Sequence, residues 1–159
     1  MCEIPPIRML VLTLTGRCNF KCLYCYASEQ DPVDMTEETA IAAVALAHVS
    51  KNQFLLQFSG GEPLLQFPLI RKVVDFVEKN HVNVQMQIQT NGALLTKDIG
   101  KWLFDHHVGI GISCDGRPEL MNSLRVSKDG DRSSQKVIQA FQNLGESNIE
   151  AGITCVVTD

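Results

Sequence analysis

Three of the six cysteines, Cys18, Cys22 and Cys25, crowd into eight residues with the spacing CxxxCxxC. In a reducing cytosol, clustered cysteines indicate metal binding rather than disulfides. An ordinary [4Fe-4S] cluster takes four cysteines, one for each iron, so a compact set of three leaves one iron free to bind a group that is not protein. A catalytic zinc site is similar, because its protein ligands leave one position open for the reactant. The residues therefore predict a [4Fe-4S] cluster with one open iron.

Two alternatives for these thiols are a zinc site and a purely electron-carrying cluster completed by a distant cysteine, for which Cys114 is the obvious candidate. Side chains alternate between the two faces of a strand, so Cys114 shares the apolar face of the segment 108–114 and should pack on helices. Ser113 points the opposite way. We expect Cys155 to be a buried packing residue in a hydrophobic strand and Cys2 to be a bystander near the terminus.

Segments rich in Val, Ile, Leu, Phe and Thr predict strands, and apolar residues repeating at helical spacing predict helices between them. Asp34 is expected to cap the first helix, with Glu37 closing a capping box and the helix running through Ala47. Thr96 should cap the third helix. The strands are expected at 8–15, 54–59, 82–90, 108–114 and 149–157, and two further helices at 68–79 and 134–144. Strands that alternate with helices predict right-handed βαβ units and a parallel sheet.

The third expected strand has an amide face, because Gln85, Gln87 and Gln89 alternate with apolar residues. A closed, dry barrel would not favour this pattern. One interpretation is a half-exposed edge strand. The other is a barrel whose lumen is wide and polar enough to hold a ligand. Periodicity alone leaves both interpretations open.

Length and composition restrict the class of protein. At 159 residues and 45% hydrophobic content, the chain is long enough for one domain with a core, because a domain takes roughly 100 to 200 residues. The net charge of -4 and the lack of a Lys/Arg-rich run argue against nucleic acid as a partner. No apolar run approaches the length of a membrane span and the first residues lack the apolar core of a signal peptide, so we expect a cytoplasmic protein without a membrane partner.

Four motifs follow successive expected strands. CxxxCxxC carries an aromatic residue, Tyr24, directly before its last cysteine, and SGGEP stands at 59–63, QTNG at 89–92 and ISCDG at 112–116. Together they resemble the signature of the radical S-adenosylmethionine (SAM) superfamily. The resemblance implies an α/β fold, a partial parallel (β/α) barrel of the radical SAM type with about five βα units, whose strand ends gather the active site. We expect one radical SAM core domain over 1–159, truncated before the last barrel strand and a cysteine-rich region.

The same resemblance implies a role for each motif. The cysteines at 18, 22 and 25 would hold the cluster, and SAM would chelate its open iron. The charges of Arg125 and Glu62 support such roles without the resemblance. A planar guanidinium pairs with a carboxylate, and a glutamate attracts an ammonium group, so both ends of an amino acid would be matched. The residues expected to contact SAM are Tyr24 near the adenine, Ser59, Gly60, Gly61 and Glu62 at the amino group, Asn91 in the QTNG motif, Ser113 at the ribose and Arg125 at the carboxylate.

The implied reaction is reductive cleavage of SAM to a 5′-deoxyadenosyl radical, which needs no side-chain acid or base. The motifs are most similar to those of peptide- and protein-modifying maturases, with anaerobic sulfatase-maturating enzymes as the nearest recognised relatives. The implied partners are a peptide or protein substrate and a flavodoxin- or ferredoxin-like electron donor. Two alternatives stay open: an activase that installs a glycyl radical, and a non-catalytic iron-sulfur module for electron transfer.

Overall fold

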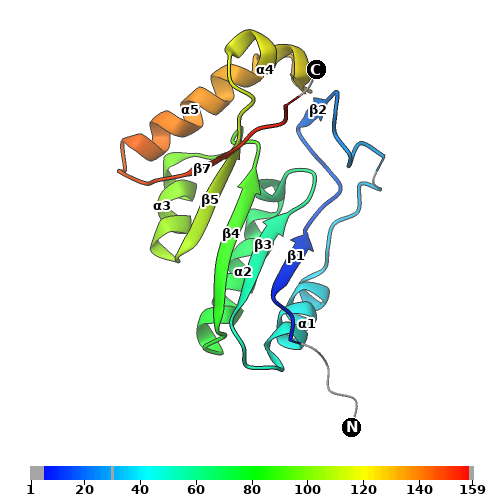
Figure 1. Cartoon of the computed structure of the whole chain (residues 1–159), viewed down its shortest axis with the longest axis vertical. Helices are drawn as coiled ribbons and strands as arrows, with labels where there is room; N and C mark the ends of the chain where they lie inside the picture. The colour runs from blue at the N-terminus through cyan, green and yellow to red at the C-terminus, as the bar shows by residue number, and fades with distance from the viewer. Residues whose placement is uncertain (1–5, 30, 158–159) are drawn as a thin grey trace.

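The computed structural model describes residues 6–29 and 31–157, so Cys2 lies outside the described residues. At its centre is a sheet of five parallel strands in the order β1-β3-β4-β5-β7 (Figure 1). The strands are β1 (Met9–Thr13), β3 (Phe54–Ser59), β4 (Val84–Thr90), β5 (Val108–Ser113) and β7 (Gly152–Thr154). Helices connect successive strands of this sheet, which confirms the predicted α/β fold with a partial parallel barrel.

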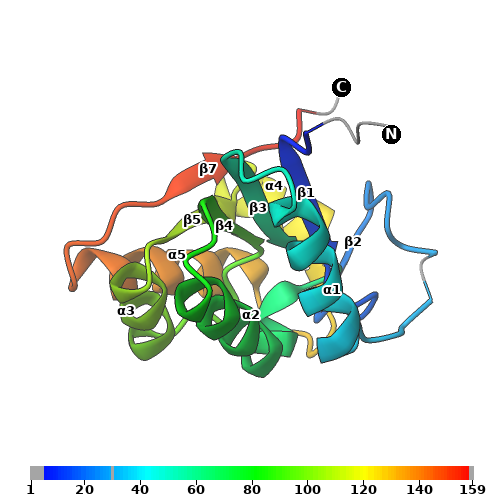
Figure 2. The same ribbon diagram turned by 90° about the horizontal axis from the view of Figure 1, so that it is seen from below.

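Helices cover one side of the sheet. Figure 2 shows α1, α2, α3 and α5 along that side, whereas the opposite face is open. None of the described helices is long and apolar enough to cross a membrane. The helices are α1 (Glu37–His48), the 3-10 helix η1 (Pro63–Gln66), α2 (Phe67–Lys79), α3 (Lys97–Asp105), α4 (Pro118–Leu124) and α5 (Ser133–Gly145).

A second, two-stranded sheet lies beyond the carboxyl end of β1 (Figure 1). It pairs β2 (Phe20–Cys22) with β6 (Arg125–Ser127) in antiparallel register, and Cys22 stands opposite Arg125. Neither segment is among the strands expected from the sequence. This pairing fastens the cysteine loop to a chain segment about 100 residues further on, so the loop has a fixed backbone.

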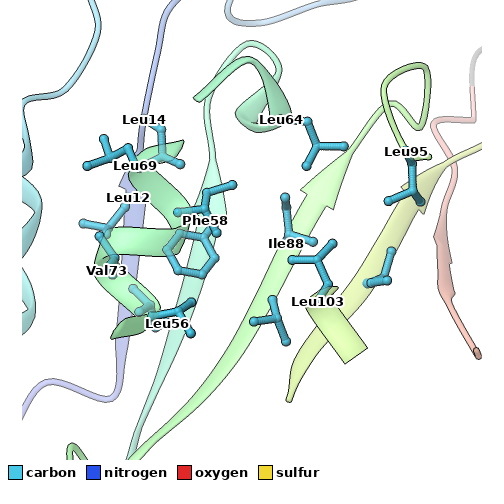
Figure 3. Packing of buried hydrophobic residues seen from close by; sticks show 14 of the residues in the cluster. Leu12, Leu14, Leu56, Phe58, Leu64, Leu69, Val73, Ile88, Leu95 and Leu103 are labelled. Atoms are coloured by element: carbon cyan, nitrogen blue, oxygen red, sulfur yellow. The ribbon is translucent and has the colours of Figure 1, made fainter. Parts of the chain in front are cut away.

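The core lies between the sheet and its helices, as the side chains of Figure 3 show. Along β3 every second residue is buried, so that Phe58 faces the helices while Gln57 faces the open side. Ile70 and Val73 of α2 are fully buried against this face. Each such apolar side chain contributes about 1.5–3 kcal/mol through its removal from water, and this packing holds the strand ends in place.

Two expectations about individual residues were wrong. Thr36, not Asp34, caps α1, because the Thr36 hydroxyl accepts the hydrogen bond from the Thr39 amide at 3.2 Å. Asp34 instead accepts hydrogen bonds from Thr15 and Arg17 on the segment before the cysteines. Cys155 is exposed rather than buried, because the regular part of the last strand is short and its three residues are all exposed.

The amide face of β4 belongs to a central strand, since β3 and β5 pair with its two sides. The edge-strand interpretation is therefore wrong. The side-chain nitrogen Nε2 of Gln87 donates to the side-chain oxygen Oε1 of Gln57 at 2.6 Å, and both side chains lie on the face away from the core. They line, together with three glycines and Thr154, a cavity of about 380 Å³. The open face of the sheet thus carries uncharged amide side chains on β3 and β4, whereas Met9 and Val11 of β1 are exposed apolar residues.

Candidate functional site

The three cysteines of the motif lie around β2, at the carboxyl end of the parallel sheet. Cys18, Cys22 and Cys25 are all half-buried, and together with Gly61 they line a cavity of about 300 Å³. A turn closes the loop, because the Cys25 amide donates to the Cys22 carbonyl at 3.2 Å. The structure therefore brings all three thiols to one cavity, as the sequence predicted.

Burial and the repulsion between thiolates favour the protonated form of Cys18 and Cys22 in the bare protein. Burial raises the pKa of Cys18, and it raises the pKa of Cys22 to about 11 against the lowering effect of Arg125. Negative charge on the neighbouring thiolates acts in the same upward direction. A strongly positive centre would overcome this and hold Cys18 and Cys22 as thiolates.

The donor set suits an iron-sulfur cluster. Thiolates are the soft ligands that such clusters use. Across residues 6–29 and 31–157, no group of three or more His, Cys, Asp or Glu side chains is arranged to hold a single metal ion. The thiols instead line the wall of a cavity, which fits a polynuclear centre between them.

A glycine turn after β3 packs directly on the backbone of the cysteine loop. The Gly61 amide donates to the Thr15 carbonyl at 2.7 Å, and the Glu62 amide donates to the Arg17 carbonyl at 2.9 Å. A Cβ atom at Gly61 would lie 2.3 Å from the Arg17 oxygen, and Gly60 has a φ of 146°, which side-chain-bearing residues rarely adopt. Glycine is required here because two backbones touch.

Glu62 is buried and supports the site through hydrogen bonds, and its carboxylate is not exposed to solvent. Its side chain is fully buried, and its Oε1 atom accepts hydrogen bonds from the Leu64 amide at 3.0 Å and from the Thr90 hydroxyl at 2.6 Å. Its Oε2 atom accepts from the Asn91 amide at 2.8 Å. Burial raises the pKa of Glu62 against these hydrogen bonds. The carboxylate thus joins the turn after β3 to the end of β4.

Asn91 continues this connection to the cysteines. Its side-chain nitrogen donates to the side-chain oxygen Oδ1 of Asn19 at 2.8 Å and lies 3.7 Å from the Cys18 sulfur. Its side-chain oxygen Oδ1 accepts from the Ala93 backbone amide at 2.9 Å. The QTNG motif therefore reaches the cysteine loop through one buried amide.

Arg125 is held by an acidic residue that the sequence analysis did not assign to the site. Its Nε and Nη2 atoms donate to the two carboxylate oxygens of Asp115 at 2.7 and 3.0 Å, and the pair is almost completely buried. Tyr24 donates its hydroxyl to the same carboxylate, and the guanidinium lies 5.4 Å from the Tyr24 ring centre. Burial opposes the charge, yet the bonds from Arg125 and Tyr24 hold the pKa of Asp115 below its ordinary value.

The other predicted positions lie at the neighbouring strand ends. Ser59 ends β3, and Ser113 ends β5, where its hydroxyl accepts from the side-chain nitrogen Nε2 of Gln89 at 3.1 Å. Cys114 packs against the core, with its sulfur 3.7 Å from that of Met121, as the strand periodicity predicted. The residues that the sequence analysis missed are Asn19, Thr90 and Asp115, although each belongs to one of the four motifs and could have been suspected on that ground.

Comparisons with known proteins agree with this geometry. Residues 12–159 match the family described as the Radical SAM superfamily. An uncharacterized protein of Methanocaldococcus jannaschii is 39% identical over 96% of this chain and 54% of its own length. A cysteine-type anaerobic sulfatase-maturating enzyme of Clostridium perfringens is 29% identical over 98% of this chain and 45% of its own length. The chain thus spans about half the length of these relatives.

Solved structures show the same fold. The native anSMEcpe structure with bound AdoMet and the Kp18Cys peptide superposes with a TM-score of 0.87 at 28% identity, over 97% of this chain and 44% of that chain. SuiB of Streptococcus suis bound to its precursor peptide SuiA has a TM-score of 0.76 at 17% identity, over 97% of this chain and 34% of that chain.

The first prediction concerns the glycine turn. Gly61→Ala should lower the unfolding midpoint and reduce iron uptake during cluster reconstitution, because its methyl group would collide with the Arg17 carbonyl. Gly145→Ala is the matched control, since a Cβ atom there meets nothing within 4 Å. Thermal melts and iron analysis measure both effects. Equal behaviour of the two variants would contradict the close backbone contact.

The second prediction concerns the buried ion pair. Asp115→Ala should lower the free energy of unfolding by about 3–5 kcal/mol, because it leaves the Arg125 guanidinium buried without its partner. Asp105→Ala removes an exposed partner of Lys101 and should cost less than about 0.5 kcal/mol. Denaturant titrations of the cluster-free protein compare the two. A similar small loss for both variants would show that the Asp115 pair does not hold the site together.

Proposed function

This chain belongs to the radical SAM superfamily, and from that premise we propose that it holds a [4Fe-4S] cluster through Cys18, Cys22 and Cys25 and cleaves SAM reductively. A bound, reduced cluster supplies the electron that breaks the carbon–sulfur bond of SAM, giving methionine and a 5′-deoxyadenosyl radical. The observation that carries the proposal is the convergence of three thiols on one cavity beside the glycine turn. We also propose that 1–159 forms a single radical SAM core domain.

The chain's own residues would bind and orient SAM. We propose that the backbone of the Ser59, Gly60 and Gly61 turn takes the amino group of SAM, while Glu62 holds that turn in place through its three hydrogen bonds. This differs from the direct ammonium contact expected for Glu62, because its carboxylate is fully buried. Arg125 uses two nitrogens on Asp115, and a guanidinium has further N–H groups that can reach the SAM carboxylate.

Three further residues, Ser113, Tyr24 and Asn91, complete the proposed SAM site. The Ser113 hydroxyl would contact the ribose, and the Tyr24 ring would lie near the adenine. The hydrogen bond from Tyr24 to Asp115 fixes that ring. Burial is the main cause that raises the pKa of the Tyr24 hydroxyl, and the bond to Asp115 adds to it. Tyr24 thus stays protonated and donates rather than carrying charge into the site. Asn91 stands at the end of β4 between the glycine turn and the cysteine loop.

The proposed substrate is a peptide or protein. The similarity to a sulfatase-maturating enzyme and to the anSMEcpe structure with a bound peptide supports this. The open face of the sheet supports it independently, because Gln57 and Gln87 offer amide donors and acceptors that match a peptide backbone. A small flavodoxin- or ferredoxin-like protein would supply the electron.

The third prediction tests the reaction. The protein is reconstituted anaerobically with iron and sulfide, reduced with dithionite and given SAM. It should release 5′-deoxyadenosine, measured by mass spectrometry, and its cluster EPR signal should change. Cys22→Ala should abolish both, whereas Cys155→Ala, at an exposed cysteine, should retain both. An unaltered EPR signal with no product would instead support an electron-transfer module.

The fourth prediction tests the peptide surface. Gln87→Ala should weaken binding of the Kp18Cys peptide about two- to tenfold, because one hydrogen bond contributes about 0.5–1.5 kcal/mol. Gln139→Ala, at an exposed position of α5 on the helical side, is the matched control and should leave affinity unchanged. Calorimetry measures both. Identical affinities for the two variants would exclude the amide face as the peptide surface.

A further inference from the structure

The side chain of Asn91 has one permitted orientation. The Ala93 backbone amide is a donor and lies 2.9 Å from Oδ1, so the oxygen of the Asn91 side chain must face Ala93. The nitrogen therefore faces the cysteine loop, 2.8 Å from the Asn19 oxygen and 3.7 Å from the Cys18 sulfur. This assignment depends on the hydrogen-bond network and not on a choice between two equivalent flips.

The surrounding contacts prevent this amide from swinging away. Asn91 is only 7% exposed, and its backbone amide donates to the buried carboxylate of Glu62 at 2.8 Å. Thr90 donates to the same carboxylate and accepts from the Gly92 amide at 3.1 Å. Asn91 is thus held by the buried Glu62 carboxylate and by the turn of residues 90–93. Neither contact involves a cysteine.

Cys18 is the cysteine of the motif that receives these donors. Its sulfur accepts from the Phe20 amide at 3.3 Å and from the Asn91 side chain at 3.7 Å, both within reach of a large sulfur acceptor. The Asn19 oxygen lies 3.9 Å from the same sulfur and can accept from the protonated thiol alone. Once Cys18 binds a metal centre as a thiolate, its proton having left to solvent, the N–H donors are the contacts that remain favourable.

Hydrogen bonds to ligand sulfurs are one of the means by which a protein sets the potential of an iron-sulfur cluster. An N–H group beside a thiolate stabilises negative charge on it, and the reduced cluster carries one more negative charge than the oxidised cluster. We propose that Asn91 is a positioning residue that raises the reduction potential of the cluster through its N–H bond to Cys18. This inference rests on the proposed function, because it requires Cys18 to be a cluster ligand.

The step in question is a one-electron reduction. The electron comes from the external donor and enters the cluster, and no covalent bond is made or broken. Asn91 acts on this step through the Cys18 sulfur, and a measurement without SAM separates this action from its proposed contact with SAM. A residue that only supports the loop would change cluster yield and stability, whereas a residue that bonds to the ligand sulfur would also change the potential.

The fifth prediction is a difference in reduction potential. Asn91→Ala, reconstituted and titrated by EPR-monitored potentiometry without SAM, should show a reduced-to-oxidised ratio about tenfold lower at a fixed potential, a shift of about 59 mV downward for one electron. Asn91→Asp keeps the acceptor for Ala93 and replaces the donor by an oxygen, so it should shift the potential in the same direction. Asn143→Ala is the matched control. It removes a side-chain hydrogen bond to the Leu95 carbonyl that does not involve a cysteine, so it should keep the original potential.

The possible outcomes separate this inference from the proposed function. If the unaltered protein takes up no iron and sulfide, the proposed function fails. If all variants assemble the cluster and share one potential, the proposed role of Asn91 is overturned while the cluster assignment stands. If neither Asn91 variant assembles a cluster and Asn143→Ala does, the role of Asn91 is only to support the cysteine loop. This result also overturns the proposed effect on the reduction potential. A downward shift in Asn91→Ala with normal iron content supports the inference, whereas a shift in Asn91→Asp alone overturns it, because the added negative charge explains that shift.

Discussion

A buried carboxylate holds together the loops on which the site depends. Glu62 receives hydrogen bonds from its own turn, from the end of β4 and from the backbone of Asn91, at 2.6 to 3.0 Å. Such a group is costly to bury unless its lone pairs are satisfied, and here they are. Because the turn that carries Glu62 also bonds to the backbone of residues 15 and 17, one residue links β3, β4 and the cysteine loop. The position of the thiols therefore depends on contacts that are not made by the cysteines.

A second buried charge fixes the opposite side of the loop. The Asp115 and Arg125 pair lies beside Cys22, whose strand pairs with that of Arg125. The cysteine loop is thus held from one side by a hydrogen-bonded carboxylate and from the other by an ion pair. Both arrangements are rigid because a buried charge that loses its partner is strongly unfavourable. A loop held in this way can present three thiols to one cavity before any metal is bound.

Local patterns were enough to predict much of this molecule. Strand and helix periodicity predicted the parallel sheet, and the cysteine spacing predicted which thiols converge, because both depend on residues close in sequence. Three features depend on long-range pairing and could not be predicted in that way: the β2–β6 ribbon, the bond between Tyr24 and Asp115, and the burial of Glu62. A charged residue in a loop suggests contact with solvent or ligand, and only the fold shows that Glu62 and Arg125 have partners within the chain.

The central claim is that three thiolates hold a four-iron cluster and leave one iron for SAM. Mössbauer spectroscopy of protein reconstituted with iron-57 tests it most directly. Addition of SAM should change the isomer shift of one iron site in four while the other three stay as they were. A spectrum in which SAM changes no iron site, or metal analysis that finds a single zinc per chain, would contradict the account.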